Sequence, residues 1–99
     1  LYLGGNLMSR LSGIPVVEAT WDAASIADGN EVAVDVTVPG AALGDFALAS
    51  LSLDVADLVL SVAVTAADTA TAVLANNTGG AIDLGSATLS VYVIPKSVI

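Results

Sequence analysis

The sequence predicts an all-β domain, in the form of a small antiparallel β-sandwich or a jelly-roll-like barrel. Three observations favour this fold class. Apolar and polar residues alternate with a period of two in several segments, which is the pattern of half-buried strands. Turn-forming residues separate these segments at intervals of roughly 10 to 15 residues, as in sandwiches and barrels. No segment has both the length and the periodicity of a helix.

We predict that residues 1–20 form an extended N-terminal arm and that residues 21–99 form the β-sandwich domain. The first 20 residues show no sustained period, and Gly4-Gly5-Asn6 and Gly13-Ile14-Pro15 interrupt them. Glycine and proline in such clusters are typical of irregular, extended chain. We expect the arm to be anchored by Val16, Val17 and Trp21 where it enters the domain.

The first predicted strand is Asn30–Val38, in which four valines alternate with alanine, aspartate and threonine. Val32, Val34, Val36 and Val38 are predicted to face the core. Asp28-Gly29-Asn30 predicts the turn before this strand, and Pro39-Gly40 ends it. Ala41–Gly44 forms at most a helical turn.

The next strand is predicted at Phe46–Leu53, where both alternating faces are largely apolar. This pattern favours a central strand, or one covered on both faces. Val55–Leu58 forms at most a helical turn. Two further strands, joined by the short link Ala66-Ala67-Asp68, are predicted at Leu58–Thr65 and Thr69–Ala75. The first sets Leu58, Leu60, Val62 and Val64 on one face, and the second sets Ala70, Ala72 and Leu74 on one face.

Asn76-Asn77-Thr78-Gly79-Gly80 is the strongest turn signal in the chain and predicts a hairpin turn. Asn76-Asn77-Thr78 also matches the glycosylation sequon, but we interpret it as turn chemistry. The last strand is predicted at Ala87–Ile94, before Pro95. Its inward residues are Leu89, Val91 and Val93, and its outward residues are Ser90 and Tyr92.

The composition argues against an enzyme, so we expect no catalytic residue, no cofactor and no metal site. The chain has no histidine and no cysteine, which removes the usual proton shuttle, thiol nucleophile and soft metal ligands. A catalytic Ser-Lys pair would need Lys96 as its base, but Lys96 lies near the C-terminus, a poor position for a desolvated base. The carboxylate pairs Asp54 with Asp57 and Asp28 with Glu31 remain, but a 99-residue sandwich with four aromatic residues has little room for a glycosidase cleft. Turn formation explains Asp28-Gly29-Asn30-Glu31 without a calcium loop.

The charge balance excludes further classes of partner. The net charge is −8 with only two basic residues, whereas nucleic acids and anionic membranes are bound mainly through Lys and Arg. No stretch provides the ~20 mostly apolar residues of a membrane-spanning helix. Because 56% of the residues are hydrophobic, we predict a structural or binding protein that forms oligomers. Trp21 and Phe46 are the expected anchors of the core or of an interface.

Several blocks of residues 21–95 resemble a family of short virion proteins of tailed phages, similar to capsid decoration (cement) or head-fibre proteins. These blocks are Trp21-Asp22-Ala23-Ala24-Ser25-Ile26-Ala27-Asp28-Gly29, Val38-Pro39-Gly40-Ala41-Ala42-Leu43-Gly44-Asp45-Phe46, Asn76-Asn77-Thr78-Gly79-Gly80 and Val91-Tyr92-Val93-Ile94-Pro95. The resemblance implies a β-sandwich that binds the outer surface of an icosahedral phage head as a homotrimer. It would there tie neighbouring copies of the phage major capsid protein together.

On this hypothesis the arm carries the contacts with the capsid, because it is apolar and has no net charge while the domain is acidic. The residues expected to dock are Leu1, Tyr2, Leu3, Leu7, Met8, Arg10, Leu11 and Ile14. Two alternatives remain open. One is another virion role, such as a head-fibre base or a tail component. The other is a carbohydrate-binding β-sandwich module that uses Tyr92, the best-placed outward aromatic residue.

Overall fold

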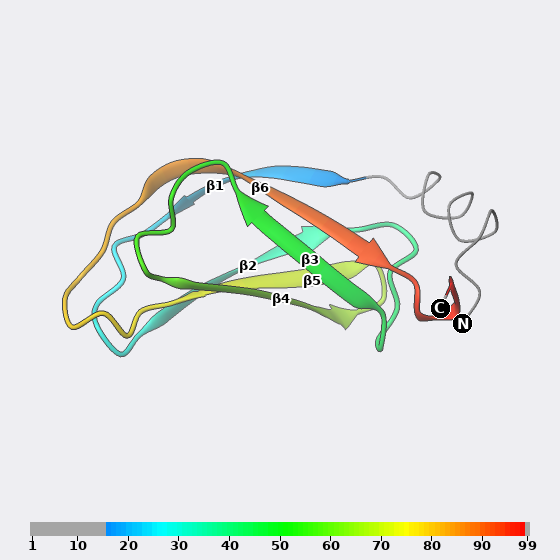
Figure 1. Ribbon diagram of the computed structural model, residues 1–99. Helices are drawn as coiled ribbons and strands as arrows, with labels where there is room; N and C mark the ends of the chain where they lie inside the picture. Colours follow the sequence, from blue (N-terminus) through cyan, green and yellow to red (C-terminus); the bar gives the residue numbers. More distant parts are fainter. Residues whose placement is uncertain (1–15, 99) are drawn as a thin grey trace.

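The computed structural model describes residues 16–98, which form two three-stranded antiparallel sheets packed face to face (Figure 1). The sheets have the strand orders β1-β6-β3 and β2-β5-β4. The predicted all-β sandwich is therefore confirmed. The strands are β1 (Val17–Ala23), β2 (Glu31–Thr37), β3 (Phe46–Leu51), β4 (Val59–Ala66), β5 (Thr69–Ala75) and β6 (Gly85–Ile94), and a 3-10 turn, η1 (Lys96–Val98), follows.

The core lies between the two central strands, β5 and β6. Alternation along β5 and β6 turns small and branched residues inward, and the most completely buried of them have no exposed surface. The inward positions predicted for β2, β4, β5 and β6 are all buried or half-buried, which confirms the period-two assignment. The buried cluster consists of Trp21, Ala23, Ile26, Val36, Val38, Ala41, Leu58, Val64, Ala70, Ala72, Leu74, Leu89, Val91 and Val93.

The sandwich begins earlier in the chain than the predicted boundary at residue 21. β1 starts at Val17 and pairs with β6 over its whole length, from Val17 opposite Val91 to Ala23 opposite Gly85. Its side chains alternate, with Val17 and Ala19 half-buried and Trp21 buried. Residues 17–20 therefore belong to the first sheet and not to the arm.

β3 is an edge strand, so the prediction that it is central or covered on both faces is wrong for the single chain. It pairs only with β6, from Phe46 opposite Ile94 to Leu51 opposite Leu89. Ala47, Ala49 and Leu51 pack against the core, while Phe46 and Leu48 point outward and are exposed. The apolar outer face of β3 is left uncovered by the rest of the described chain.

One end of the sandwich, here called the acidic end, carries the loops 24–30, 52–58 and 76–84 (Figure 1). Loop 76–84 passes from β5 in one sheet to β6 in the other, so the predicted hairpin turn there is a crossover between sheets. It is fixed to loop 24–30 by a pair of backbone hydrogen bonds between Ile26 and Ile82. Local turn chemistry specified the change of direction but not the sheet that the chain joins next.

The opposite end, here called the entry end, carries Val16 and the segments 38–45, 67–68 and 95–98 (Figure 1). The predicted link between β4 and β5 is confirmed, and Asp68 adopts φ 60° there, a conformation that aspartate tolerates better than most residues. Its carboxylate accepts a hydrogen bond from the Gly40 N–H at 2.8 Å. The segments Ala41–Gly44 and Val55–Leu58 contain turns, and η1 is the only helical element among residues 16–98.

Candidate interaction surface

The outer face of the β1-β6-β3 sheet is apolar on the half nearest the entry end. The strand registers place side chains in rows across the sheet, because Leu48 lies opposite Tyr92 and Phe46 lies opposite Ile94. Continuing the β1–β6 register by one residue sets Val16 beside Tyr92, on the other side from Leu48. We call this set of five residues the outer-face patch: Val16, Phe46, Leu48, Tyr92 and Ile94.

A shallow hollow of about 290 Å³ overlaps this patch. Its lining consists of Val16, Leu48, Ala49, Ser50, Ser90 and Tyr92. The lining comes from β3, from β6 and from Val16 just before β1, with the apolar side chains toward the entry end and the two serines toward the middle of the sheet. The hollow has the size and the apolar character to accept a side chain from a partner, with serine hydroxyls at one side.

Large hydrophobic side chains of the described chain are exposed mainly at the entry end. Val16 (57% exposed), Phe46 (51%) and Leu48 (59%) belong to the patch, and Leu43 (70%) lies in the adjoining loop 38–45. Only Val59, at the start of β4, is a comparably exposed large hydrophobic residue elsewhere among residues 16–98. Apolar side chains clustered in this way mark an interaction surface more often than scattered ones do.

The other half of the same outer face is polar. Thr20 lies opposite Thr88, and Asp22 lies opposite Ser86. The outer face of the second sheet mixes polar residues with mostly small apolar ones, and it carries hydrogen-bonded side chains. The Thr71 hydroxyl donates to the Asp35 carboxylate at 2.7 Å and lies 2.8 Å from the Thr65 hydroxyl. The outer-face patch therefore contrasts with the rest of the exposed sheet surface.

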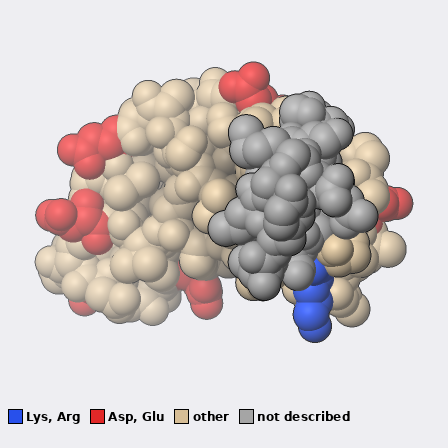
Figure 2. Space-filling view, turned by 45° about the vertical axis from the view of Figure 1, so that its right-hand side comes forward, with Lys and Arg blue, Asp and Glu red and all other residues tan. Residues whose placement is uncertain are grey.

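Acidic side chains gather at the end of the molecule away from the patch. Six of the ten lie in the acidic-end loops or within two residues of them: Asp22, Asp28, Glu31, Asp54, Asp57 and Asp83. The entry end carries Asp45, Asp68 and Lys96, while Glu18 and Asp35 lie along the strands. In Figure 2 the acidic side chains lie near the rim of the visible face, with broad uncharged surface between them. The surface is therefore polarised, with an apolar end and an acidic end.

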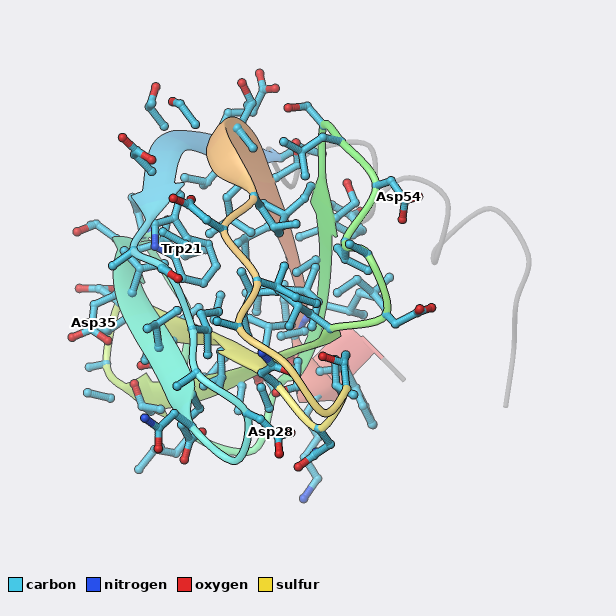
Figure 3. The ribbon with its side chains drawn as sticks, turned by 90° about the vertical axis from the view of Figure 1, so that its left-hand side faces the viewer. Trp21, Asp28, Asp35 and Asp54 are labelled. Atoms are coloured by element: carbon cyan, nitrogen blue, oxygen red, sulfur yellow. The ribbon has the colours of Figure 1, made fainter. Side chains whose placement is uncertain are left out.

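Several carboxylates accept hydrogen bonds from backbone N–H groups in the loops, among them Asp28, which the sequence placed in a turn. Asp28 accepts a hydrogen bond from the Gly79 N–H at 3.0 Å, and Asp54 accepts one from the Ala56 N–H at 2.9 Å. At the entry end, Asp45 accepts hydrogen bonds from the N–H groups of Ala42 and Lys96. Figure 3 shows Asp28, Asp35 and Asp54 at the periphery. No group of three acidic side chains within residues 16–98 is placed to hold a metal ion.

Asn76 is the one buried polar residue in the described chain, and its side chain uses its full hydrogen-bonding capacity. Its amide donates to the carbonyl oxygens of Ile26 at 2.7 Å and Gly80 at 2.8 Å. Its Oδ1 accepts hydrogen bonds from the N–H and the hydroxyl of Thr78. This network confirms the interpretation of the Asn76-Asn77-Thr78 sequon as turn chemistry, because the amide nitrogen of Asn76 is buried and already bonded.

The predicted site residues fall into two groups. The docking residues of the arm lie outside the described residues: Leu1, Tyr2, Leu3, Leu7, Met8, Arg10, Leu11 and Ile14. Of the two expected anchors, Trp21 lies in the core between the sheets (Figure 3), whereas Phe46 lies on the outer face and is not a core residue. Lys96 is exposed, at the start of η1.

Sequence reasoning missed Val16, Leu48 and Ile94 as surface residues. The available signal was an apolar residue at an outward position of an alternating strand. Leu48 carries this signal in β3, but the pattern was attributed to a strand covered on both faces. Ile94 carries the same signal beside Tyr92 on the outward face of β6.

We compared the chain with protein-family models, curated proteins and solved structures, and none of the three comparisons gave a match. Within residues 16–98, no helix is long and apolar enough to cross a membrane.

Proposed function

We propose that the chain is a structural virion protein that binds the outer surface of an icosahedral phage head as a homotrimer and stabilises it. The observation that carries this proposal is the polarised surface, with exposed apolar side chains at the entry end and six carboxylates at or beside the acidic-end loops. A protein that coats a shell needs one surface for its partners and another that stays solvated. The two ends of this sandwich supply both.

The entry end is the end proposed to approach the capsid. Val16, where the described chain begins, belongs to the outer-face patch at this end, and residues 1–15 precede it in the sequence. Those residues carry the apolar side chains that are expected to dock. The acidic end then points away from the shell, where like charges favour solubility over further association.

Stabilisation of the head requires no chemical reaction, and the proposed role is not enzymatic. A ligand that binds only the assembled shell adds RT ln(1 + [L]/Kd) to the stability of that shell, which is about 2.7 kcal/mol at a free concentration of 100 Kd. Several contacts held in one trimer would add avidity, because each further contact becomes intramolecular after the first. The resemblance to phage decoration and head-fibre proteins supports the same role.

Deletion of residues 1–14 is expected to abolish binding to phage heads while the sandwich stays folded. The deletion removes all eight proposed docking residues but leaves Val16 and β1 intact. Binding is measured by cosedimentation with heads that lack the protein, and folding by circular dichroism. Full coating of heads by the shortened chain would contradict the docking role of the arm. Failure of the full chain to bind any head would contradict the capsid role itself.

A different virion position, such as a head-fibre base or a tail component, is distinguished by crosslinking. Lys96 is exposed at the entry end, and Arg10 belongs to the arm. A decoration protein is expected to crosslink through these side chains to the major capsid protein. A tail component would crosslink only to other virion proteins.

A carbohydrate-binding module is the second candidate, and the hollow beside Tyr92 is the observation that favours it. Sugars stack on aromatic rings and bond to hydroxyl groups, and the hollow offers one ring with Ser50 and Ser90 at its side. Binding on a glycan array that is lost on Tyr92→Ala would favour this candidate over the capsid role.

A further inference from the structure

We infer that the outer-face patch is the contact surface between copies of this chain. This inference rests on the oligomeric part of the proposed function and not on its capsid part. It identifies the surface that the copies share, which neither the resemblance nor the composition specifies. The occupant of the patch is a second copy of the same sandwich.

The first argument is the apolar character of the patch in a single chain. Phe46 and Leu48 are more than half exposed on the edge strand β3, and Tyr92 and Ile94 lie beside them on β6. Aromatic residues are enriched at interfaces, and a few side chains buried near the centre of an interface supply most of its binding energy. The hollow between Val16, Leu48 and Tyr92 gives a protruding side chain of the second copy a place to insert.

The second argument is the position of the charges. None of the five patch residues is charged, and on the same face the nearest acidic side chain in the β1 ladder is Glu18, opposite Ser90. The molecule is 47 Å long and 24 × 23 Å across, and screening acts over about 8 Å at physiological ionic strength. Copies that meet through the patch leave the acidic-end loops outside the contact. Copies that met at the acidic ends would bring six carboxylates of each chain together.

The third argument is the contrast with the second sheet. The outer face of β2-β5-β4 carries the bonded group of Asp35, Thr71 and Thr65, whose hydroxyls and carboxylate are hydrogen-bonded to one another. Burying such polar groups against a flat partner costs free energy unless each one finds a new bond. The patch carries no such penalty, apart from the tyrosine hydroxyl and the two serines of the hollow.

The test is sedimentation equilibrium of the full chain and of three full-length variants. Leu48→Ser and Phe46→Ser each place a hydroxyl in the patch at an exposed position, so the fold is expected to persist. Each is expected to weaken self-association about tenfold or more, given the burial energy of a large side chain. Val59→Ser is the matched control, since Val59 is similarly exposed (55%) but lies at the start of β4. It is expected to leave the association unchanged.

Each outcome separates the inference from the proposed function. Loss of association in the two patch variants but not in Val59→Ser supports the assigned surface. Patch variants that keep the wild-type mass overturn the surface but leave the oligomer intact. A wild-type chain that stays monomeric at every concentration overturns both the inference and the proposed trimer. Binding of that monomer to phage heads would still preserve the capsid role.

Discussion

Replacing Asn76 with alanine is expected to lower the free energy of unfolding by about 2–4 kcal/mol, a large part of the stability of a small domain. The side chain has no exposed surface, and four hydrogen bonds tie it to Ile26, Thr78 and Gly80. Its backbone also bonds to loop 24–30, through Gly29 and Asn30. Loss of the side chain therefore loosens the crossover that joins the two sheets.

The neighbouring asparagine supplies the control. Asn77 is exposed, so Asn77→Ala is expected to change the stability by no more than about 0.5 kcal/mol. Both variants are measured by urea denaturation followed by circular dichroism. Equal effects at the two positions would show that the Asn76 network does not hold the crossover.

The second large effect is expected at Trp21, where alanine should destabilise the domain by about 3–5 kcal/mol. The indole is 8% exposed and belongs to the core cluster between the sheets (Figure 3). Truncation removes a large apolar contact and leaves a cavity that the rigid sheets close only in part. Guanidinium unfolding of the wild-type chain and the variant, followed by circular dichroism, gives the change in the free energy of unfolding.

Phe46→Ala is the matched aromatic truncation. Phe46 is 51% exposed on the outer face of β3, so its loss is expected to cost about 1 kcal/mol or less in the folded monomer. For self-association the order should be the opposite. Phe46→Ala should weaken self-association more than Trp21→Ala does, because Phe46 is proposed to lie in the contact surface. A larger loss of folding stability at Phe46 than at Trp21 would contradict the assignment of inner and outer faces.

Most strands could be predicted from the sequence because alternation directly reflects burial on one face of a sheet. The valines of β2 and the inward residues of β4, β5 and β6 all lie as predicted. β1 carried the same signal, in Val17, Ala19 and Trp21, but four of its residues were assigned to the arm. The error arose because glycine and proline in the preceding residues suggested that irregular chain continued to residue 20.

The pairing of strands could not be predicted, because it depends on contacts far apart in the sequence. Asn76 and the glycines after it specify a turn, but nothing local tells whether the next strand continues the same sheet or joins the other. The buried state of Asn76 was missed for the same reason. Its bond to the Ile26 carbonyl spans 50 residues.

The outer-face patch could be predicted only in part from the sequence. Alternating apolar residues on both faces of β3 indicate that each face is covered, but not by which chain. The structure instead makes β3 an edge strand and leaves Phe46 and Leu48 exposed. The pattern itself is consistent with a strand that a second copy covers on its outer side.

The most direct test of the proposed assembly is the mass of the purified full chain in solution, measured by light scattering after size exclusion. The chain has a mass of 9.7 kDa. A stable species of three times this mass is the expected result, and it should fall toward the monomer when Leu48 is replaced by serine. A single species of 9.7 kDa at every concentration would contradict the claim that this protein acts by assembling through its apolar surface.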